Sequence, residues 1–235
     1  MTVVFAGALF CGTAGAQVDL GTLRGIAGRG TASSLTSDQA TAGLKEALSR
    51  GVSTAVASTG KPGGYFENAA IKILMPSKLQ RLEPGMRAIG MGPQIDAFVK
   101  SMNKAAEDAA PAAKAILMNA LQSMTIMDAK GIVTGGSTAG TAYFKRTTTA
   151  EIQTAFRPIV ERQMAKAGVT QQFNDLMGRA PKLPFGKTPE LDVNQYVLDK
   201  ATDGLFVVMG QEETKIRTNP AAQTTPLLKT VFGGR

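Results

Sequence analysis

Two carboxylates, Glu107 and Asp128, are the residues of this chain with the best chemistry for catalysis. Two carboxyl groups in different environments can serve as acid and base, because burial and nearby charges move their pKa values apart. Other catalytic groups are scarce, since the 235 residues contain no histidine and one cysteine, Cys11. A serine–histidine–aspartate triad, a cysteine–histidine pair and a histidine-based zinc site are therefore excluded.

Polar residues gather around one of these carboxylates. Asn103 and Glu107 lie four residues apart, so a helix places them on one face, and Asp128 could approach them from the following turn. Together they predict a polar pocket for a cation or a hydroxylated ligand. The alternative is structural: Lys104 and Asp108 pair on the surface, Asn103 and Glu107 are solvated, and Asp128 caps the next helix.

Lys72, Tyr143 and Arg217 are further candidates for binding a ligand. Arg217 follows Glu213 by four residues, which predicts either a surface ion pair or a clamp for a carboxylate or phosphate. Tyr143 precedes Lys145 and Arg146, an arrangement that would suit an anionic lipid head above an apolar slot. Lys72 could bind a ligand or take part in catalysis through its ammonium group.

No metal or cofactor is predicted. The glycine-rich stretch at 131–141 lacks the lysine that a phosphate-binding loop requires, and its glycines predict close helix packing instead. Methionines are frequent between Met75 and Met127, and thioethers can bind Cu(I). These methionines fall on apolar stripes, which favours a place in the core.

The elements that would position these residues are helices. Apolar residues recur at helical spacing through most of the chain, whereas Ile71, Ile73 and Met75 alternate and indicate one short extended segment near residues 70–75. The fold class is therefore all-α, a multi-helix bundle. Helices are expected at 37–60 and from 77 with a break near residues 84–85. Two antiparallel or kinked helices are expected from 92 to about 124, interrupted at Pro111. After an N-cap at Ser137, a further helix carries apolar residues from 152 to 164 and ends near 168, and the last helices are expected at 191–218 and 227–232.

The first residues are typical of an export signal. Residues 1–16 carry no charge and end in Ala-Gly-Ala, which predicts a signal peptide cleaved before Gln17 and a periplasmic or secreted protein. A lipid anchor at Cys11 and a buried first helix are the alternatives. Residues 17–36 read as a flexible lead-in, and 37–235 as a single helical domain or two lobes joined by a loop at 179–190.

The net charge of the chain indicates which kinds of partner it could attract. The net charge is +8, and its excess lies in the central part of the chain. Such a bias attracts anionic membrane surfaces, unless it serves only solubility. Nucleic acid is not expected as a partner, because no long basic run occurs, and neither is a transmembrane helix.

Four strings together resemble one family. They are GYFENAAIKILMP from Gly64, MNKAAEDAAPAAKAIL from Met102, MTIMDAKGIVTGGSTAGTAYF from Met124 and DGLFVVMGQEETKIRTNPAAQTTPLLKTVF from Asp203. They are similar to bacterial domain-of-unknown-function family 4197, over residues 44–232. The resemblance implies an exported helical protein and brings no activity with it.

The residues and the resemblance favour a non-enzymatic binding or structural protein of the bacterial envelope. Its partner would be another protein or an amphiphilic ligand. One alternative is a hydrolase of an envelope polymer with Glu107 and Asp128 as acid and base, which needs both carboxylates in one deep pocket. The other is a carrier of lipid, which needs an enclosed apolar cavity of at least a few hundred Å³.

Overall fold

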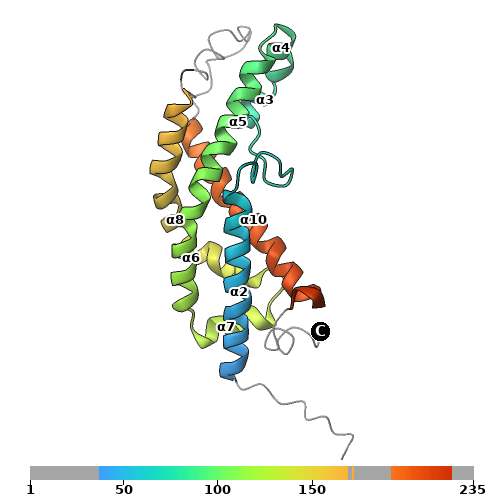
Figure 1. Cartoon of the computed structure of the whole chain (residues 1–235), viewed down its shortest axis with the longest axis vertical. Helices are drawn as coiled ribbons and strands as arrows, with labels where there is room; N and C mark the ends of the chain where they lie inside the picture. The colour runs from blue at the N-terminus through green and yellow to red at the C-terminus, as the bar shows by residue number, and fades with distance from the viewer. Residues whose placement is uncertain (1–36, 169–170, 172–191, 224–235) are drawn as a thin grey trace, which may run out of the picture. The chain divides into compact units, whose positions relative to one another are not determined.

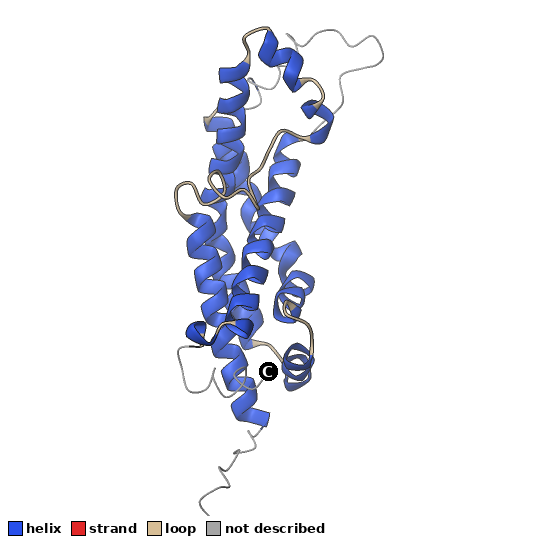
Figure 2. Cartoon of the chain, turned by 90° about the vertical axis from the view of Figure 1, so that its right-hand side faces the viewer, coloured by secondary structure: helices blue, strands red, loops and turns tan. Residues whose placement is uncertain are grey.

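The computed structural model describes residues 37–168, 171 and 192–223, and the regular elements in them are all helical (Figures 1 and 2). The predicted all-α class is confirmed. The predictions for a signal peptide, a lead-in, a loop at 179–190 and a final helix at 227–232 lie outside the described residues. The helices are α2 (Ser37–Gly60), α3 (Ser77–Gln80), α4 (Glu83–Ala88), α5 (Gly92–Ala109), η1 (Ala110–Ala112), α6 (Ala113–Gln122), α7 (Ile126–Thr134), α8 (Ala139–Lys166), α10 (Val193–Thr218) and η2 (Pro220–Ala222).

Four long helices form the body of the bundle. Helix α10 packs against α8, α2 and α5, and α8 also packs against α5 and α6. Their facing stripes bury large side chains completely, among them Phe98, Phe144 and Phe156. Burial of such apolar surface is the main favourable contribution to folding. Within the described residues, no helix combines the length and hydropathy that crossing a bilayer requires.

Helix α5 follows the predicted apolar stripe. Ile95, Phe98 and Met102 are fully buried, as the helical spacing requires. Pro111 cannot donate a backbone hydrogen bond, so the helix tightens into the single 3₁₀ turn η1 and then continues as α6. Of the two arrangements compatible with the sequence, a kinked helix and an antiparallel pair, Figure 1 shows the kinked one.

The segment before Pro76 crosses the bundle without forming a strand within the described residues. Its side chains alternate as predicted: Ile71, Ile73 and Met75 are buried, whereas Leu74 is 52% exposed. An extended chain buried on one side must still satisfy its backbone polar groups. The Asn103 side chain of α5 forms hydrogen bonds with the N–H and the carbonyl of Ile73 in this segment.

Candidate functional site

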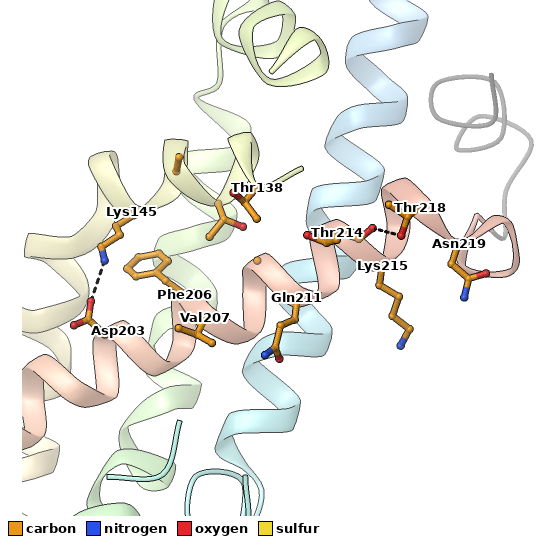
Figure 3. Close-up of a pocket in the computed structure, with 13 residues that line it drawn as sticks. Thr138, Lys145, Asp203, Phe206, Val207, Gln211, Thr214, Lys215, Thr218 and Asn219 are labelled. Carbon is orange, nitrogen blue, oxygen red and sulfur yellow. Dashed lines mark hydrogen bonds and ion pairs between the residues drawn. The ribbon is translucent and has the colours of Figure 1, made fainter. Parts of the chain in front are cut away.

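An open groove of about 1100 Å³ runs between the first turns of α8 and the outer face of α10 (Figure 3). Helix α8 contributes one wall and helix α10 the floor. The side of α8 carries Thr141, Ala142 and Lys145, preceded by Thr138. The lining residues of α10 and its end are Asp203, Phe206, Val207, Gly210, Gln211, Thr214, Lys215, Thr218 and Asn219.

The groove has an apolar base and a polar rim. Phe206 is almost fully buried, and Val207 is 44% exposed although it is a large apolar residue. Lys145 and Asp203 form an ion pair of 3.0 Å across the rim, which Figure 3 shows as a dashed line. The rim thus offers both charges and several hydrogen-bonding side chains around an apolar base, a pattern typical of binding sites.

A second hollow continues the groove along α10. It measures about 310 Å³ and shares Asp203 and Val207 with the first. Its other wall is the extended segment, and Tyr196 donates a hydrogen bond of 3.0 Å from its hydroxyl to the carbonyl of Leu74 there. The two hollows follow α10 from Tyr196 to Asn219, about 35 Å at the rise of an α-helix. The shape suits an elongated ligand.

Glu213 of α10 holds the α8 wall in place. Its Oε1 accepts a hydrogen bond from the Gly140 N–H at 2.9 Å, and its Oε2 accepts from the N–H and hydroxyl of Thr141 at 2.7 and 2.8 Å. The first N–H groups of a helix have no partner inside it, and the helix dipole favours a negative charge there. Glu213 therefore caps α8 from a different helix.

Arg217 completes this arrangement. Its Nε and Nη2 donate to Glu213 Oε1 at 3.0 and 2.9 Å, and Nη2 also donates to the Ile132 carbonyl at 2.9 Å. That carbonyl lies in the last turn of α7, where a cation is favourable. One ion pair thus caps the end of α7 and the start of α8.

The Glu213–Arg217 pair that the sequence predicts is present, but it is buried rather than on the surface. The two side chains are 5% and 8% exposed. The guanidinium binds a side chain and a backbone carbonyl of this chain, so its role here is to position the groove wall.

Gly140 explains how α8 approaches so closely. A Cβ added there would lie 2.5 Å from Leu48 Cδ2 and 3.1 Å from Glu213 Oε1. The packing role predicted for the glycine-rich stretch therefore holds at Gly140. It does not hold at Gly131 and Gly136, where an added Cβ would meet no atom within 4 Å.

Glu107 and Asn103 anchor irregular backbone to α5. Glu107 Oε1 accepts hydrogen bonds from the N–H groups of Tyr65 and Phe66, at 3.1 and 3.2 Å. Asn103 accepts from the Ile73 N–H at 2.9 Å and donates to the Ile73 carbonyl at 2.8 Å. Both side chains are buried rather than solvated, contrary to the alternative drawn from the sequence. The Asn103 amide replaces the neighbouring strand that an extended segment would otherwise need.

Asp128 lies in the first turn of α7. It forms a capping box with Thr125, in which each side chain accepts from the backbone N–H of the other residue. The hydrogen bond from the Thr125 hydroxyl, with help from the Thr125 N–H, lowers the pKa of Asp128 below its usual value of 3.8. Arg146 lies 3.9 Å from its carboxylate.

Tyr143 belongs to the same neighbourhood. The Arg146 guanidinium lies 5.7 Å from the centre of its ring, and its hydroxyl donates to the Ala120 carbonyl at 3.1 Å. Burial, followed by the charge of Asp128, raises the pKa of Tyr143. Tyr143 and Phe144 are both buried, so the apolar slot expected beside them is filled by their own rings.

Lys72 and Tyr65 flank the Glu107 region. The Lys72 ammonium lies 4.0 Å from the centre of the Phe66 ring, a cation–π contact. Tyr65, which the sequence did not single out, is fully buried and donates to the Ala201 carbonyl at 2.6 Å. Burial raises the pKa of its hydroxyl, and the nearby Glu107 carboxylate adds to that rise.

The two carboxylates proposed as acid and base have different surroundings. Glu107 is buried against the turn after α2, and Asp128 lies partly exposed beside Thr125. None of the cavities described here is lined by both. Among the described residues, no group of three acidic, histidine or cysteine side chains could hold a metal ion.

The interior is tightly packed where α2, α8 and α10 meet. The apolar cavity there, lined by residues including Leu48, Phe144 and Met209, measures about 20 Å³. A bound lipid needs at least a few hundred Å³. This cavity is therefore too small for a carried lipid, and the larger hollows are open to solvent.

Comparison with known proteins identifies a family. The model of a family described as "Protein of unknown function (DUF4197)" matches residues 34–233. No curated protein and no solved structure matches the chain.

Proposed function

The chain belongs to the DUF4197 family of proteins of unknown function, and we propose that it is a non-enzymatic binding protein of the bacterial envelope. Its α8–α10 groove would hold an elongated amphipathic segment of a partner protein. The observation that carries this proposal is the groove itself, which with the second hollow follows α10 for about 35 Å at the rise of a helix and has Phe206 and Val207 at an apolar base inside a polar rim.

The chemistry of the rim favours a polypeptide over a lipid. Lys145 and Asp203 present both charges, and Gln211 presents an amide that can both donate and accept. A peptide can use all of these groups through its backbone and side chains, whereas an acyl chain uses none. The groove is also open along its length, which suits a segment that is attached to a larger partner.

The groove wall is fixed before any partner binds. Glu213, Arg217 and Thr141 lock the start of α8 to α10 through buried hydrogen bonds. A preformed site loses less conformational entropy on binding than one that must be ordered by its ligand. The place in the envelope rests on the apolar leader at 1–16 and its Ala-Gly-Ala end.

Native mass spectrometry of the protein purified from its own host tests the proposal. We expect a bound polypeptide in the wild-type spectrum and its loss in Val207→Asp, which places a charge on the apolar base of the groove. The loss of one buried valine contact lowers the affinity for the polypeptide by about tenfold or more. Met127→Asp is the matched control, because Met127 is 82% exposed on α7 and does not line the groove.

The outcomes separate the candidate functions. If wild type carries a bound mass in the range of a phospholipid and Val207→Asp loses it, the ligand of the groove is a lipid and not a partner protein. A polypeptide that stays bound to Val207→Asp, or that Met127→Asp removes equally, would overturn the assignment of the groove.

A further inference from the structure

One oxygen of the Glu107 carboxylate has nothing to accept within the described residues. Oε1 takes both backbone hydrogen bonds, from Tyr65 and Phe66, whereas no hydrogen bond or ion pair of the described residues reaches Oε2. The side chain is only 4% exposed. A carboxylate offers about four acceptor positions, and leaving buried ones unused is costly. Such a group calls for an explanation beyond anchoring the turn.

Glu107 lines a pocket of about 640 Å³ that is separate from the groove. Lys100, Lys104 and Glu107 follow one another at spacings of four and three on α5, so they share one face of that helix. Lys166, in the last turn of α8, lines the pocket from the other side. Ser101 and Gln163 add groups that both donate and accept hydrogen bonds.

The lysines in this pocket set the charge of a ligand. Lys104 pairs with Asp108, but within the described residues neither Lys100 nor Lys166 has an ion-pair partner. Two free ammonium groups repel a metal cation and attract an anion. Glu107 and Glu67, which also lines the pocket, repel an anion, and Glu107 in addition needs a hydrogen-bond donor for Oε2. A ligand that satisfies both carries an anionic group at one end and a hydrogen-bond donor at the other, and a hydroxyl group supplies that donor without adding a positive charge next to the lysines.

We propose that this pocket binds a small polyol phosphate, with the phosphate held by Lys100 and Lys166 and a hydroxyl donated to Oε2 of Glu107. The site is independent of the groove and goes beyond the proposed partner-protein function. The same chemistry occurs in free glycerol phosphate and in the head group of phosphatidylglycerol, so the experiment includes both sources.

Isothermal titration calorimetry of the full chain compares glycerol 3-phosphate, inorganic phosphate and glycerol. We expect glycerol 3-phosphate to bind at least about tenfold more tightly than either fragment, because only it engages the lysines and Glu107 together. Sedimentation with vesicles containing phosphatidylglycerol or phosphatidylcholine alone tests the lipid source. Vesicle binding that needs phosphatidylglycerol and Glu107 would assign the head group as the ligand.

Glu107→Gln is the decisive variant. Its amide oxygen still accepts from Tyr65 and Phe66, but an NH₂ group replaces Oε2 and cannot accept the ligand hydroxyl. We expect an unchanged melting temperature and affinity for glycerol 3-phosphate lowered about tenfold or more, with inorganic phosphate binding unaffected. Lys100→Met and Lys166→Met, both at exposed positions, should each weaken glycerol 3-phosphate and phosphate alike. Lys114→Met on α6 is the control, because it is exposed and outside the pocket.

Several results would overturn the proposal. They are equal binding of phosphate and glycerol 3-phosphate, unchanged binding in Glu107→Gln, or no binding to either the free ligand or the vesicles. If Glu107→Gln unfolds, Lys100→Met and Lys166→Met test the site in its place. Wild-type affinity for glycerol 3-phosphate in both lysine variants would then overturn the proposal. None of these outcomes depends on Val207, so failure here is distinct from failure of the groove.

Discussion

Thr141 donates two hydrogen bonds to one oxygen of Glu213, from its backbone N–H at 2.7 Å and its hydroxyl at 2.8 Å. The two residues lie on different helices, 72 positions apart in the chain. The carboxylate thereby replaces the local N-cap that α8 lacks, since Thr138 at the N-cap position makes no side-chain capping bond. The geometry of the groove depends on this contact.

Glu213→Ala should strongly destabilise the protein. It leaves Arg217 buried without its carboxylate and the first N–H groups of α8 without acceptors, and breaking a buried ion pair costs about 3–5 kcal/mol. Urea unfolding followed by circular dichroism measures the change. Glu212→Ala is the control: Glu212 pairs with Lys215 at 3.8 Å on the surface, and its loss should cost about 1 kcal/mol or less. Equal effects of the two variants would contradict the capping role.

Asn103→Ala should release the extended segment from α5. It removes two hydrogen bonds to Ile73 and one to the Val99 carbonyl, and unsatisfied buried groups cost about 1–3 kcal/mol each. Hydrogen–deuterium exchange should show faster exchange of the Ile73 amide, ahead of global unfolding. Ser101→Ala removes an exposed hydrogen bond of the same helix and should leave Ile73 protected. Full protection of Ile73 in Asn103→Ala would refute the anchor.

Gly204→Ala should destabilise α10 even though alanine favours helices. The added Cβ would lie 2.6 Å from Cε1 of Tyr65 and 3.2 Å from Cβ of Ile71. Overpacking of this kind typically costs about 1–3 kcal/mol. At Gly51, where the nearest atom would be Ile216 Cδ1 at 3.9 Å, the same change should stabilise by up to about 1 kcal/mol. A melting temperature that falls for Gly204→Ala and rises for Gly51→Ala would confirm the tight packing at Gly204 and the free space at Gly51. A change of the same sign in both variants would contradict this packing.

Asp128 should make stability depend on pH in the acidic range. Its folded-state pKa lies below the usual 3.8, so its contribution is fully present above that value and is lost as the pH falls through the folded pKa. Wild type should therefore be more stable than Asp128→Asn at pH 7, and the difference should shrink below about pH 4. Unfolding curves of wild type and Asp128→Asn at pH 7 and at pH 3 measure the difference in their free energies of unfolding. A difference that persists unchanged at pH 3 would show that Asp128 is not held ionised by Thr125.

The helices were predictable because their signals are local. Helix α2 has the bounds expected from Ser37 and Gly60, and the buried stripe of α5 follows directly from the spacing of its apolar residues. The capping box at Thr125 depends on residues three apart, so the role of Asp128 could also be read from the sequence. Periodicity identifies which face of a helix is buried but does not identify its neighbour.

The groove and the buried polar contacts were missed for that reason. Glu213 reads as a surface residue in its own helix, and only the packing of α10 against α8 reveals its acceptors. Asn103 and Glu107 likewise read as solvated, because their partners lie in irregular backbone 30 to 42 residues earlier. Asn103 borders the apolar stripe of α5, which was an available signal, whereas Glu107 shares a face with the exposed Lys100 and Lys104 and offered none.

The cross-helix cap of α8 has a consequence for synthesis. The carboxylate that completes the first turn of α8 is made 72 residues after Thr141, and the arginine that completes the end of α7 is made 85 residues after Ile132. An emerging chain therefore holds both helix ends open until α10 has been made. The corner between α7 and α8 therefore closes late, and the protein acquires its groove only when α10 arrives.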